Sequence, residues 1–573
     1  MKAKRLLRAG VAVAVVLLSS TQGIATENKG VGSGKIKHVL LLSIDGMHAV
    51  DFYNCANGIA GMPYCPNLAA LSATAINYVN AESSKPSDSF PGMAALASGG
   101  TPKSTGLYYD VAFDRSLAPP TIKTGSGLAG GPCVPYATPT GTTTDNDQGI
   151  DIDDTKLNGG APGHSLTDGG IASIDHLKLE RNPATGCTPV YPWNFIRINT
   201  AFGVIHAAGG YTAWIDKHPS YSFVGGPGGK GLDDYYSPEV SSNVVRLPGV
   251  TTIPIPPELQ GVPCDPIRDT TQPSGWNSSF ANIQCYDAIK VYALINEING
   301  KTHLGAPARV PAVFGMNFQS VYVGESVNEG PPVGAGGYEN AAALPSPELF
   351  SEIQYVDAAI GLIVSELKKA GIYNNTLLII TAKHGDSPID PTRYVADGTD
   401  TPATLLGDMI PYSESPLNTT GVGATEDDVS VLWLKKGVNV DTAVSMLEND
   451  AKEIGLGEIY YGATLALNYN VGGWEAGEDP RTPDIIVTPN EGVTYSSSTA
   501  MIGDHGGFAH DDTNVIMLVA NPNFTAQTVS TKTTTTQVAP TIVQALGLNP
   551  NLLDAVQIEG TAVLPEVFAQ LGK

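Results

Sequence analysis

The stretch His38-Val-Leu-Leu-Leu-Ser-Ile-Asp45-Gly46 decides the fold class of this 573-residue chain. Its apolar residues form a continuous run, and the run stops at an Asp-Gly pair of the kind that favours a turn. An unbroken apolar run of this length is expected of a strand that is buried on both faces of a parallel sheet.

Comparable runs recur along the chain, at residues 212–216, 310–318, 376–382, 429–434, 484–488 and 514–520. Helical periodicity lies between them. It is clearest after Ser346-Pro347, where apolar residues recur on one face as far as Leu367. Further helices are expected at residues 67–75, 281–298, 441–451 and 538–546. The alternation predicts an α/β fold with a mostly parallel central sheet flanked by helices on both faces.

Residues 1–25 have the features of a secretory signal peptide. Basic residues at positions 2, 4, 5 and 8 precede an apolar run over residues 9–18, and small residues follow at 23–25. The run is too short for a membrane span, and we expect no later segment to cross a bilayer. The mature protein is therefore expected to be exported, to the periplasm or the extracellular space.

Residues 35–550 are predicted to form one large domain, followed by a C-terminal tail over residues 551–573. Two stretches, near 114–191 and 219–269, are rich in Gly, Pro and Thr, so we expect them to be long surface insertions. The six cysteines suit an oxidising compartment. Sequential pairing is the simplest arrangement and would staple the insertions, although the sequence leaves the connectivity open. The pairs would be Cys55–Cys65, Cys133–Cys187 and Cys264–Cys285.

The chain is strongly acidic, with 56 Asp and Glu against 32 Lys and Arg and a net charge of −24. This charge disfavours binding to a nucleic acid polymer or an anionic lipid surface. It is compatible with a small phosphorylated substrate, for which bound metal ions would supply the positive charge. The sequence does not indicate an oligomeric state.

Ser87, Asp88 and Ser89 stand at the mouth of a short predicted helix over residues 93–98, with Pro near its start and Gly after its end. Ser is a preferred N-cap residue, so a hydroxyl here has a purely structural explanation. The alternative is a nucleophile, because the free N–H groups of a helix start favour an anion.

Polar residues with metal-binding or catalytic chemistry cluster near the ends of the predicted strands. They are Asp45, Asp216-Lys217-His218, Lys383-His384 and, before the last strand, Asp504-His505. In open parallel sheets, ligands bind beyond the carboxyl ends of the strands. Carboxylate and imidazole suit a zinc-like divalent ion, which can lower the pKa of a coordinated hydroxyl.

Four motifs occur in an order that resembles the alkaline phosphatase superfamily. They are Ser43-Ile44-Asp45-Gly46, Asp88-Ser89-Phe90-Pro91, Lys383-His384-Gly385 and Asp504-His505-Gly506-Gly507. Within the superfamily the chain resembles the type I phosphodiesterase/nucleotide pyrophosphatase family. The resemblance implies that Ser89 attacks phosphorus to form a phosphoserine intermediate, which water then hydrolyses. It also implies a two-metal centre, usually zinc, with Asp45, Ser89 and His384 on one ion and His505 on the other.

The chain departs from this family pattern at three ligand positions. Lys383 stands where the family normally has an aspartate, and Met316-Asn317-Phe318-Gln319-Ser320 lacks the family's Asp and His pair. Asp216 and His218 are candidates for replacement ligands, and Asn317 is a tentative site residue. The centre is therefore expected to hold one or two divalent ions.

Lys383 has two possible placements. It can point away from Asp45 and His384, which keeps a metal ion on Asp45, Ser89 and His384, with water or Asp216 completing the shell. Alternatively, its ammonium replaces that ion and pairs with Asp45, which leaves a single metal near His505. We expect the first placement, because Asp45, Ser89 and His384 occur together without another evident reason.

The sequence thus predicts an exported, metal-dependent hydrolase of phosphoric esters, of the phosphodiester or nucleotide pyrophosphate type. A sulfatase-like or phosphomonoesterase activity is the alternative within the superfamily, although Met93 stands where the sulfatase pattern needs an arginine. A non-catalytic binding protein with a degraded metal centre is the alternative outside enzymes. The three missing ligands favour it.

Overall fold

The computed structural model describes residues 31–572 except 33, 60, 126, 147–173, 241–244, 247–278, 412–424 and 497. The predicted signal peptide, Cys264 and most of the second predicted insertion lie outside the described residues. Within the described ranges, no helix combines the length and the apolar character that crossing a membrane requires.

The core of the molecule is an eight-stranded sheet with the order β25-β2-β24-β17-β1-β12-β8-β9. Its strands are β1 His38–Ile44, β2 Ala75–Tyr78, β8 Ala213–Ile215, β9 Asp234–Tyr236, β12 Val313–Phe318, β17 Thr376–Thr381, β24 Met517–Ala520 and β25 Gln527–Val529. β24 is antiparallel to β17 and β2, and the other pairings in this sheet are parallel. The predicted mostly parallel sheet is confirmed.

β1 occupies the middle of the sheet, between β12 and β17. Val39 pairs with Val313 on one side and with Leu377 on the other. Leu40 packs into the apolar cluster on one face of the sheet, and Leu41 packs into the cluster on the opposite face. Burial on both faces explains why the run from residue 39 to 42 is apolar without alternation.

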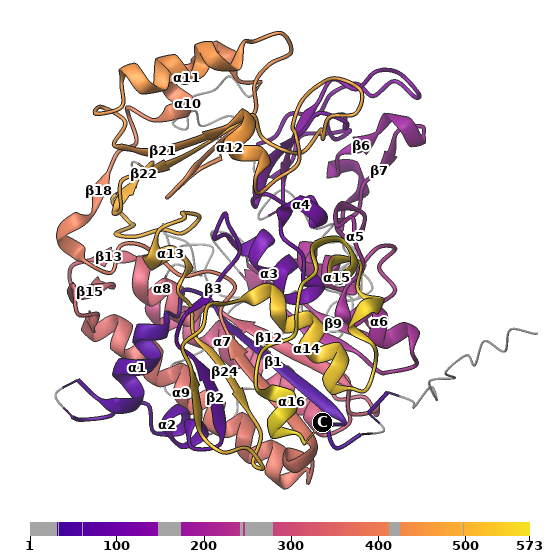
Figure 1. Cartoon of the computed structure of the whole chain (residues 1–573), viewed down its shortest axis with the longest axis vertical. Coiled ribbons are helices and arrows are strands. Elements are labelled where there is room, and N and C mark those ends of the chain that lie inside the picture. The colour runs from indigo at the N-terminus through magenta and orange to yellow at the C-terminus, as the bar shows by residue number, and fades with distance from the viewer. Residues whose placement is uncertain are drawn as a thin grey trace, which may run out of the picture.

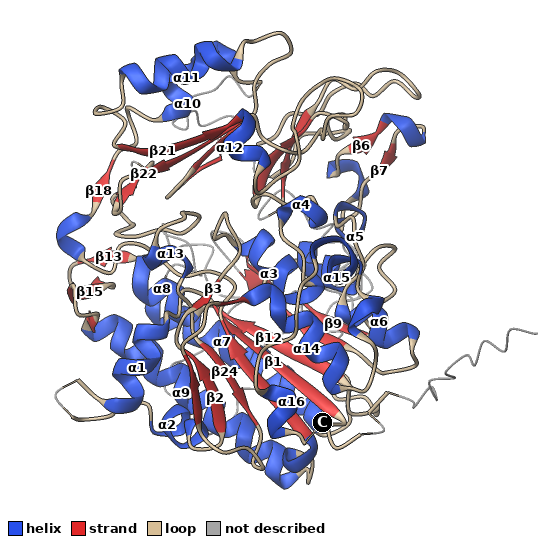
Figure 2. Ribbon diagram, viewed as in Figure 1, coloured by secondary structure: helices blue, strands red, loops and turns tan. Residues whose placement is uncertain are grey.

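Helices cover both faces of this sheet, as Figure 2 shows. The first cluster is built with α1 Ala49–Asn57, α2 Pro66–Ser72, α7 Phe280–Ile298, α8 Ser320–Ser326 and α9 Pro347–Lys369. The second cluster is built with α3 Ser89–Ser98, α6 Ala201–Ala207, α14 Val538–Ala545, α15 Asp554–Glu559 and α16 Val567–Gln570. Leu553, Leu564 and Val567 are fully buried there, so the expected C-terminal tail is part of the folded core.

The runs at residues 429–434 and 484–488 form a second sheet, and their expected place in the central sheet is wrong. This sheet has the order β19-β20-β22-β21 and lies apart from the first, at the top of Figure 1. Its strands are β19 Thr425–Glu426, β20 Ser430–Leu432, β21 Leu456–Tyr461 and β22 Ile485–Pro489, with α10 Pro402–Leu406 and α11 Val440–Asn449 beside them. Leu432 packs toward these helices and Val431 toward Tyr108 and Phe113. Because both faces of this sheet are buried, its strands are as apolar as those of a parallel sheet.

Two of the predicted disulfides are confirmed, Cys55–Cys65 and Cys133–Cys187. Cys285 in α7 is also disulfide-bonded. The predicted Cys264–Cys285 pair stays a prediction, because Cys264 lies outside the described residues. In the first expected insertion, the short hairpin strands are β4 Val111–Asp114 with β5 Thr142–Asp145, and β6 Arg181–Asn182 with β7 Thr188–Pro189. β9, from the second expected insertion, instead adds an edge strand to the central sheet.

The remaining elements are short and mostly connect the layers. They are β3 Ala81–Glu82, α4 Pro102–Thr105, α5 Pro192–Phe195, β10 Glu239–Val240, β11 Val245–Arg246, β13 Asn328–Gly330, β14 Gly334–Ala335, β15 Tyr338–Asn340, β16 Leu344–Pro345, β18 Val395–Ala396, α12 Gly462–Ala466, β23 Val493–Thr494, α13 His510–Thr513 and β26 Thr533–Thr534.

Candidate active site

Ser89 is the first residue of α3, and Asp88 is the residue that caps this helix. The Asp88 carboxylate accepts a hydrogen bond from the Phe90 N–H at 3.0 Å. The Ser89 hydroxyl is therefore not needed as a cap, and its oxygen lies 3.2 Å from Nε2 of His384. The structure thus separates the two explanations for the polar helix mouth, because Asp88 provides the cap and Ser89 faces the site.

His384, just after β17, is held in one tautomer by the backbone. Its Nδ1 lies 3.0 Å from the carbonyl oxygen of Gly385, which can only accept, so Nδ1 carries the proton. Burial, with the charge of Lys383 beside it, lowers the pKa of His384 to about 3. The ring is therefore neutral near pH 7, and its unprotonated Nε2 accepts the hydrogen bond that Ser89 donates.

Lys383 pairs with Asp45, so the expectation that it points away is wrong. Its Nζ lies 3.1 Å from Oδ2 of Asp45, and both side chains are buried. Nζ also donates to the Tyr221 hydroxyl at 3.1 Å and lies 4.5 Å from the centroid of that ring. The physical reason is burial: an ammonium without water needs a counter-ion and hydrogen-bond acceptors, and Asp45 on the neighbouring strand end is the counter-ion.

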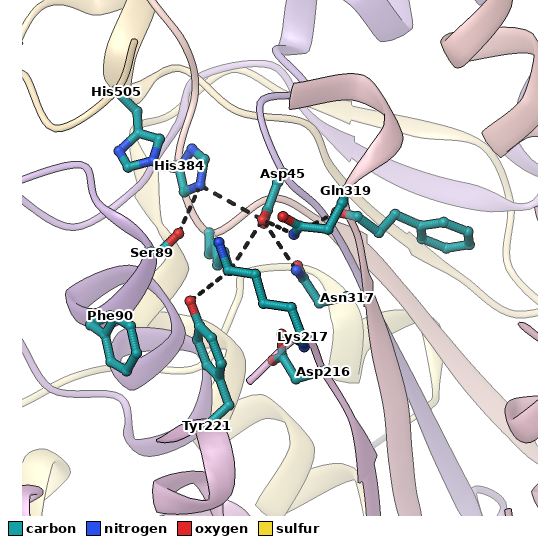
Figure 3. A network of polar contacts seen from close by, with 12 residues as sticks. Asp45, Ser89, Phe90, Asp216, Lys217, Tyr221, Asn317, Gln319, His384 and His505 are labelled. Carbon is teal, nitrogen blue, oxygen red and sulfur yellow. Dashed lines mark hydrogen bonds and ion pairs between the residues drawn. The ribbon is translucent and has the colours of Figure 1, made fainter. Parts of the chain in front are cut away.

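Two amides complete the surroundings of Asp45, as Figure 3 shows. Asn317 donates to Oδ2 at 3.1 Å, and Gln319 donates to the same oxygen. Although burial acts to raise the pKa of Asp45, Lys383 and His384 hold it below its usual range. Sequence reasoning named Asn317 but missed Gln319. Gln319 stands directly after β12, which pairs with β1, and this position was the signal that could have identified it as a site residue.

His505 reaches the same edge of the sheet from the loop before β24. Because β24 is antiparallel, the residues that precede it meet the residues that follow β1 and β17. The ring centroids of His505 and His384 are 4.1 Å apart. His505 Nδ1 lies 3.6 Å from Oδ1 of Asp88, and within the described part of the chain neither atom has a hydrogen-bond partner. Burial lowers the pKa of His505 and raises that of Asp88 to about 7.

Asp216 and His218 lie near Lys383 in a supporting role. The Asp216 carboxylate accepts from Trp214 Nε1 at 2.8 Å and from the backbone N–H of Lys217 at 2.8 Å. The His218 ring stacks on Tyr221 with centroids 6.2 Å apart. These contacts hold Asp216 on its own strand and place His218 behind the ring that Lys383 touches.

The charge of Lys383 makes the surroundings of Asp45 unfit for a metal ion, whereas His505 and Asp88 are two residues of types that bind zinc. Oδ2 of Asp45 receives an ammonium and two amide donors, while its Oδ1 has no hydrogen-bond partner among the described residues. A divalent ion about 4 Å from the ammonium would be repelled by several kcal/mol. On the other side, His505 Nδ1 and Asp88 Oδ1 are buried and have no hydrogen-bond partner in the described part of the chain. An imidazole nitrogen and a carboxylate oxygen are two of the ligand types that zinc takes.

A second buried group, His48, Asp51 and Glu325, also has residue types that bind metals. His48 Nδ1 lies 3.0 Å from Asp51 and 3.2 Å from Glu325, while Nε2 lies 2.7 Å from the carbonyl oxygen of Asp511. Although burial acts to lower it, the two carboxylates hold the pKa of His48 well above its usual value. Both ring nitrogens of His48 thus already have partners within the protein.

A cavity of about 800 Å³ lies against the second sheet, and its walls include Lys85, Tyr460, Phe508 and Asp512. Asp45, Ser89, His384 and His505 are not among the residues that line it. Ser89 itself is only 2% exposed, so the reactive groups lie in a closed interior.

The chain matches the family model described as type I phosphodiesterase/nucleotide pyrophosphatase over residues 39–139 and 336–508. The matched segments contain Asp45, Ser89, Lys383, His384 and His505. No curated protein matches the chain.

Two solved structures are similar in fold. Alkaline phosphatase PafA is 11% identical, with 89% of this chain and 96% of that chain covered and a TM-score of 0.50. Murine ectonucleotide pyrophosphatase/phosphodiesterase 5 is 15% identical, with 90% and 96% covered and a TM-score of 0.48. The likeness to PafA shows an alkaline-phosphatase-like fold.

Proposed function

The chain belongs to the type I phosphodiesterase/nucleotide pyrophosphatase family of the alkaline phosphatase superfamily, a family of phosphoric ester hydrolases, and we propose that it acts on small phosphodiesters or nucleotide-type pyrophosphates. The observation that carries this proposal is the 3.2 Å contact between Ser89 Oγ and an unprotonated His384 Nε2, at the start of a helix. A hydroxyl with a proton acceptor in reach is the arrangement of an activated nucleophile.

The reaction begins when Ser89 Oγ bonds to phosphorus while the bond from phosphorus to the leaving oxygen breaks. The hydroxyl proton moves toward His384 Nε2, its hydrogen-bond acceptor. The positive end of the α3 dipole favours an anionic group at its start. Water then cleaves the phosphoserine and releases the product with Ser89 restored.

A single divalent ion, with zinc the ion that suits these ligands, would be held by His505 and Asp88. When bound there, it would supply positive charge to a substrate oxygen as a Lewis acid. The ion would be removed by a chelator without disturbing the Lys383–Asp45 pair.

The same proposal places the protein outside the cytoplasm, in the periplasm or the extracellular space. The disulfides Cys55–Cys65 and Cys133–Cys187 form in oxidising compartments, and the N-terminal sequence has the pattern of an export signal. The net charge of −24 argues for a small substrate over a nucleic acid polymer.

One observation favours a second candidate, a binding protein without turnover. The Lys383–Asp45 pair occupies the place where the resemblance implies a metal ion. The sulfatase-like alternative is favoured by the same pair, because a lysine can contact a sulfuryl oxygen.

The test compares Ser89→Ala with Ser89→Thr, which keeps a hydroxyl at the same position. Loss of the nucleophile in a serine hydrolase costs on the order of 10⁶ in rate, so Ser89→Ala should reduce hydrolysis of bis(p-nitrophenyl) phosphate to background. Ser89→Thr should keep measurable turnover, and mass spectrometry of the quenched wild-type reaction should find phosphate on Ser89. Near wild-type activity of Ser89→Ala would rule out the covalent mechanism. A wild-type protein inactive on every phosphoric and sulfuric ester would favour the binding protein.

A further inference from the structure

We propose that the ammonium of Lys383 takes the place of a metal ion at Asp45, so that no divalent ion binds to this carboxylate. The proposal rests on the contacts of Lys383 alone and does not depend on the proposed function.

The ammonium is built into the reaction centre. Asp45 Oδ2 lies 3.1 Å from Lys383 Nζ and 3.9 Å from His384 Nε2, and the same His384 nitrogen lies 3.2 Å from Ser89 Oγ. One carboxylate oxygen therefore separates the lysine charge from the histidine that contacts the nucleophile.

The position of Lys383 is held from several sides. Its ammonium contacts the hydroxyl and the ring of Tyr221, and that ring stacks on Phe90 of α3 with centroids 4.6 Å apart. The backbone of Lys383 is pressed against the same helix, because a Cβ on Gly92 would lie 2.1 Å from the Lys383 carbonyl oxygen. Neither the side chain nor its backbone can swing away without moving the helix that carries Ser89.

The donors to Asp45 are consistent with this place of the ammonium. Oδ2 receives Lys383, Asn317 and Gln319, whereas Oδ1 has no hydrogen-bond partner among the described residues. The lysine charge is therefore what opposes a divalent ion at this carboxylate. Two of the three donors stand on the segment where the family has acidic and imidazole ligands. The chain has thus exchanged metal ligands for hydrogen-bond donors on both strands beside β1.

The experiment measures the zinc content of wild type, Lys383→Asp and Lys383→Met, each prepared with zinc in excess and then dialysed. Wild type and Lys383→Met are expected to retain at most one equivalent of zinc, whereas Lys383→Asp gains a further equivalent.

Two equivalents of zinc in wild type, one of them lost on Asp45→Asn, would overturn the proposal. So would a Lys383→Asp protein that folds and gains no zinc. If Lys383→Asp does not fold, the wild-type zinc count alone decides. The zinc count requires no turnover. An inactive wild type that holds at most one zinc would therefore refute the proposed function and still support this inference.

Discussion

At the scale of single residues, the Asp45–Lys383 pair is the contact on which the site most depends. Both side chains are buried, with exposed fractions of 1% and 0%. Removing one partner of such a pair leaves an uncompensated charge in the interior, whereas removing both together leaves none. The stability of the protein should therefore depend on the two residues jointly.

Asp45→Asn alone should lower the free energy of unfolding by roughly 3–5 kcal/mol, because it strands the Lys383 ammonium. The double variant Asp45→Asn/Lys383→Met should recover a large part of that loss, and denaturant unfolding of all four proteins gives the coupling energy. Lys369→Met breaks an exposed helix pair with Glu366 and should cost at most about 0.5 kcal/mol, as a control. Additive effects of the two buried substitutions would show that the side chains do not interact.

At the scale of elements, α3 decides where the nucleophile lies, because it packs directly on the segment after β17. All of its residues are buried, and most are small. Gly92 is the point of closest approach, since a Cβ there would lie 2.1 Å from the Lys383 carbonyl oxygen and 3.0 Å from its Cβ. A larger side chain must push the helix away from His384.

Gly92→Ala should therefore lower the free energy of unfolding by about 1–3 kcal/mol and reduce kcat/KM for a phosphodiester, because overpacking displaces Ser89 from His384. Gly203→Ala in α6 is the matched control. Its nearest neighbour would be at 3.4 Å, so it should leave activity unchanged and stabilise the protein by up to about 1 kcal/mol. Thermal unfolding and steady-state kinetics measure both, and equal behaviour of the two variants would contradict the close packing of α3.

At the scale of the whole molecule, buried glutamates outside the site make stability depend on pH. Burial raises the pKa of Glu426 to about 7, of Glu180 to about 8 and of Glu352 to about 9. Between pH 5 and these values, the folded state keeps protons that the unfolded state has lost. The free energy of unfolding then decreases as the pH rises.

The free energy of unfolding should therefore fall from pH 5 to pH 9. Each such group contributes up to about 1.4 kcal/mol per pH unit between its unfolded and folded pKa values. Glu352→Gln cannot ionise and should flatten the slope, whereas Glu448→Gln on the exposed side of α11 should leave it unchanged. Denaturant unfolding across the pH series measures this. A slope that Glu352→Gln does not alter would show that Glu352 ionises normally in the folded protein.

The sequence alone predicted the middle strands of the central sheet, several of the main helices and the edge at which Asp45, Ser89, His384 and His505 meet. Its apolar runs and helical faces reflect burial, which local patterns record directly. The same patterns misplaced residues 429–434, because a strand covered on both faces is equally apolar in any sheet. β2, β9 and β25 were missed because such short strands carry too few residues to show a pattern.

Only the tertiary structure decided which contacts the site residues make with one another and with their neighbours. The direction of Lys383 depends on Asp45 and Tyr221, which come from different parts of the chain. The role of Gln319 depends on the register that sets β12 beside β1. Local sequence determines which residues follow a strand, but the partner of a buried charge is chosen by what the neighbouring strands and loops bring within a few ångströms. The pairing of lysine with aspartate is therefore a property of the assembled fold.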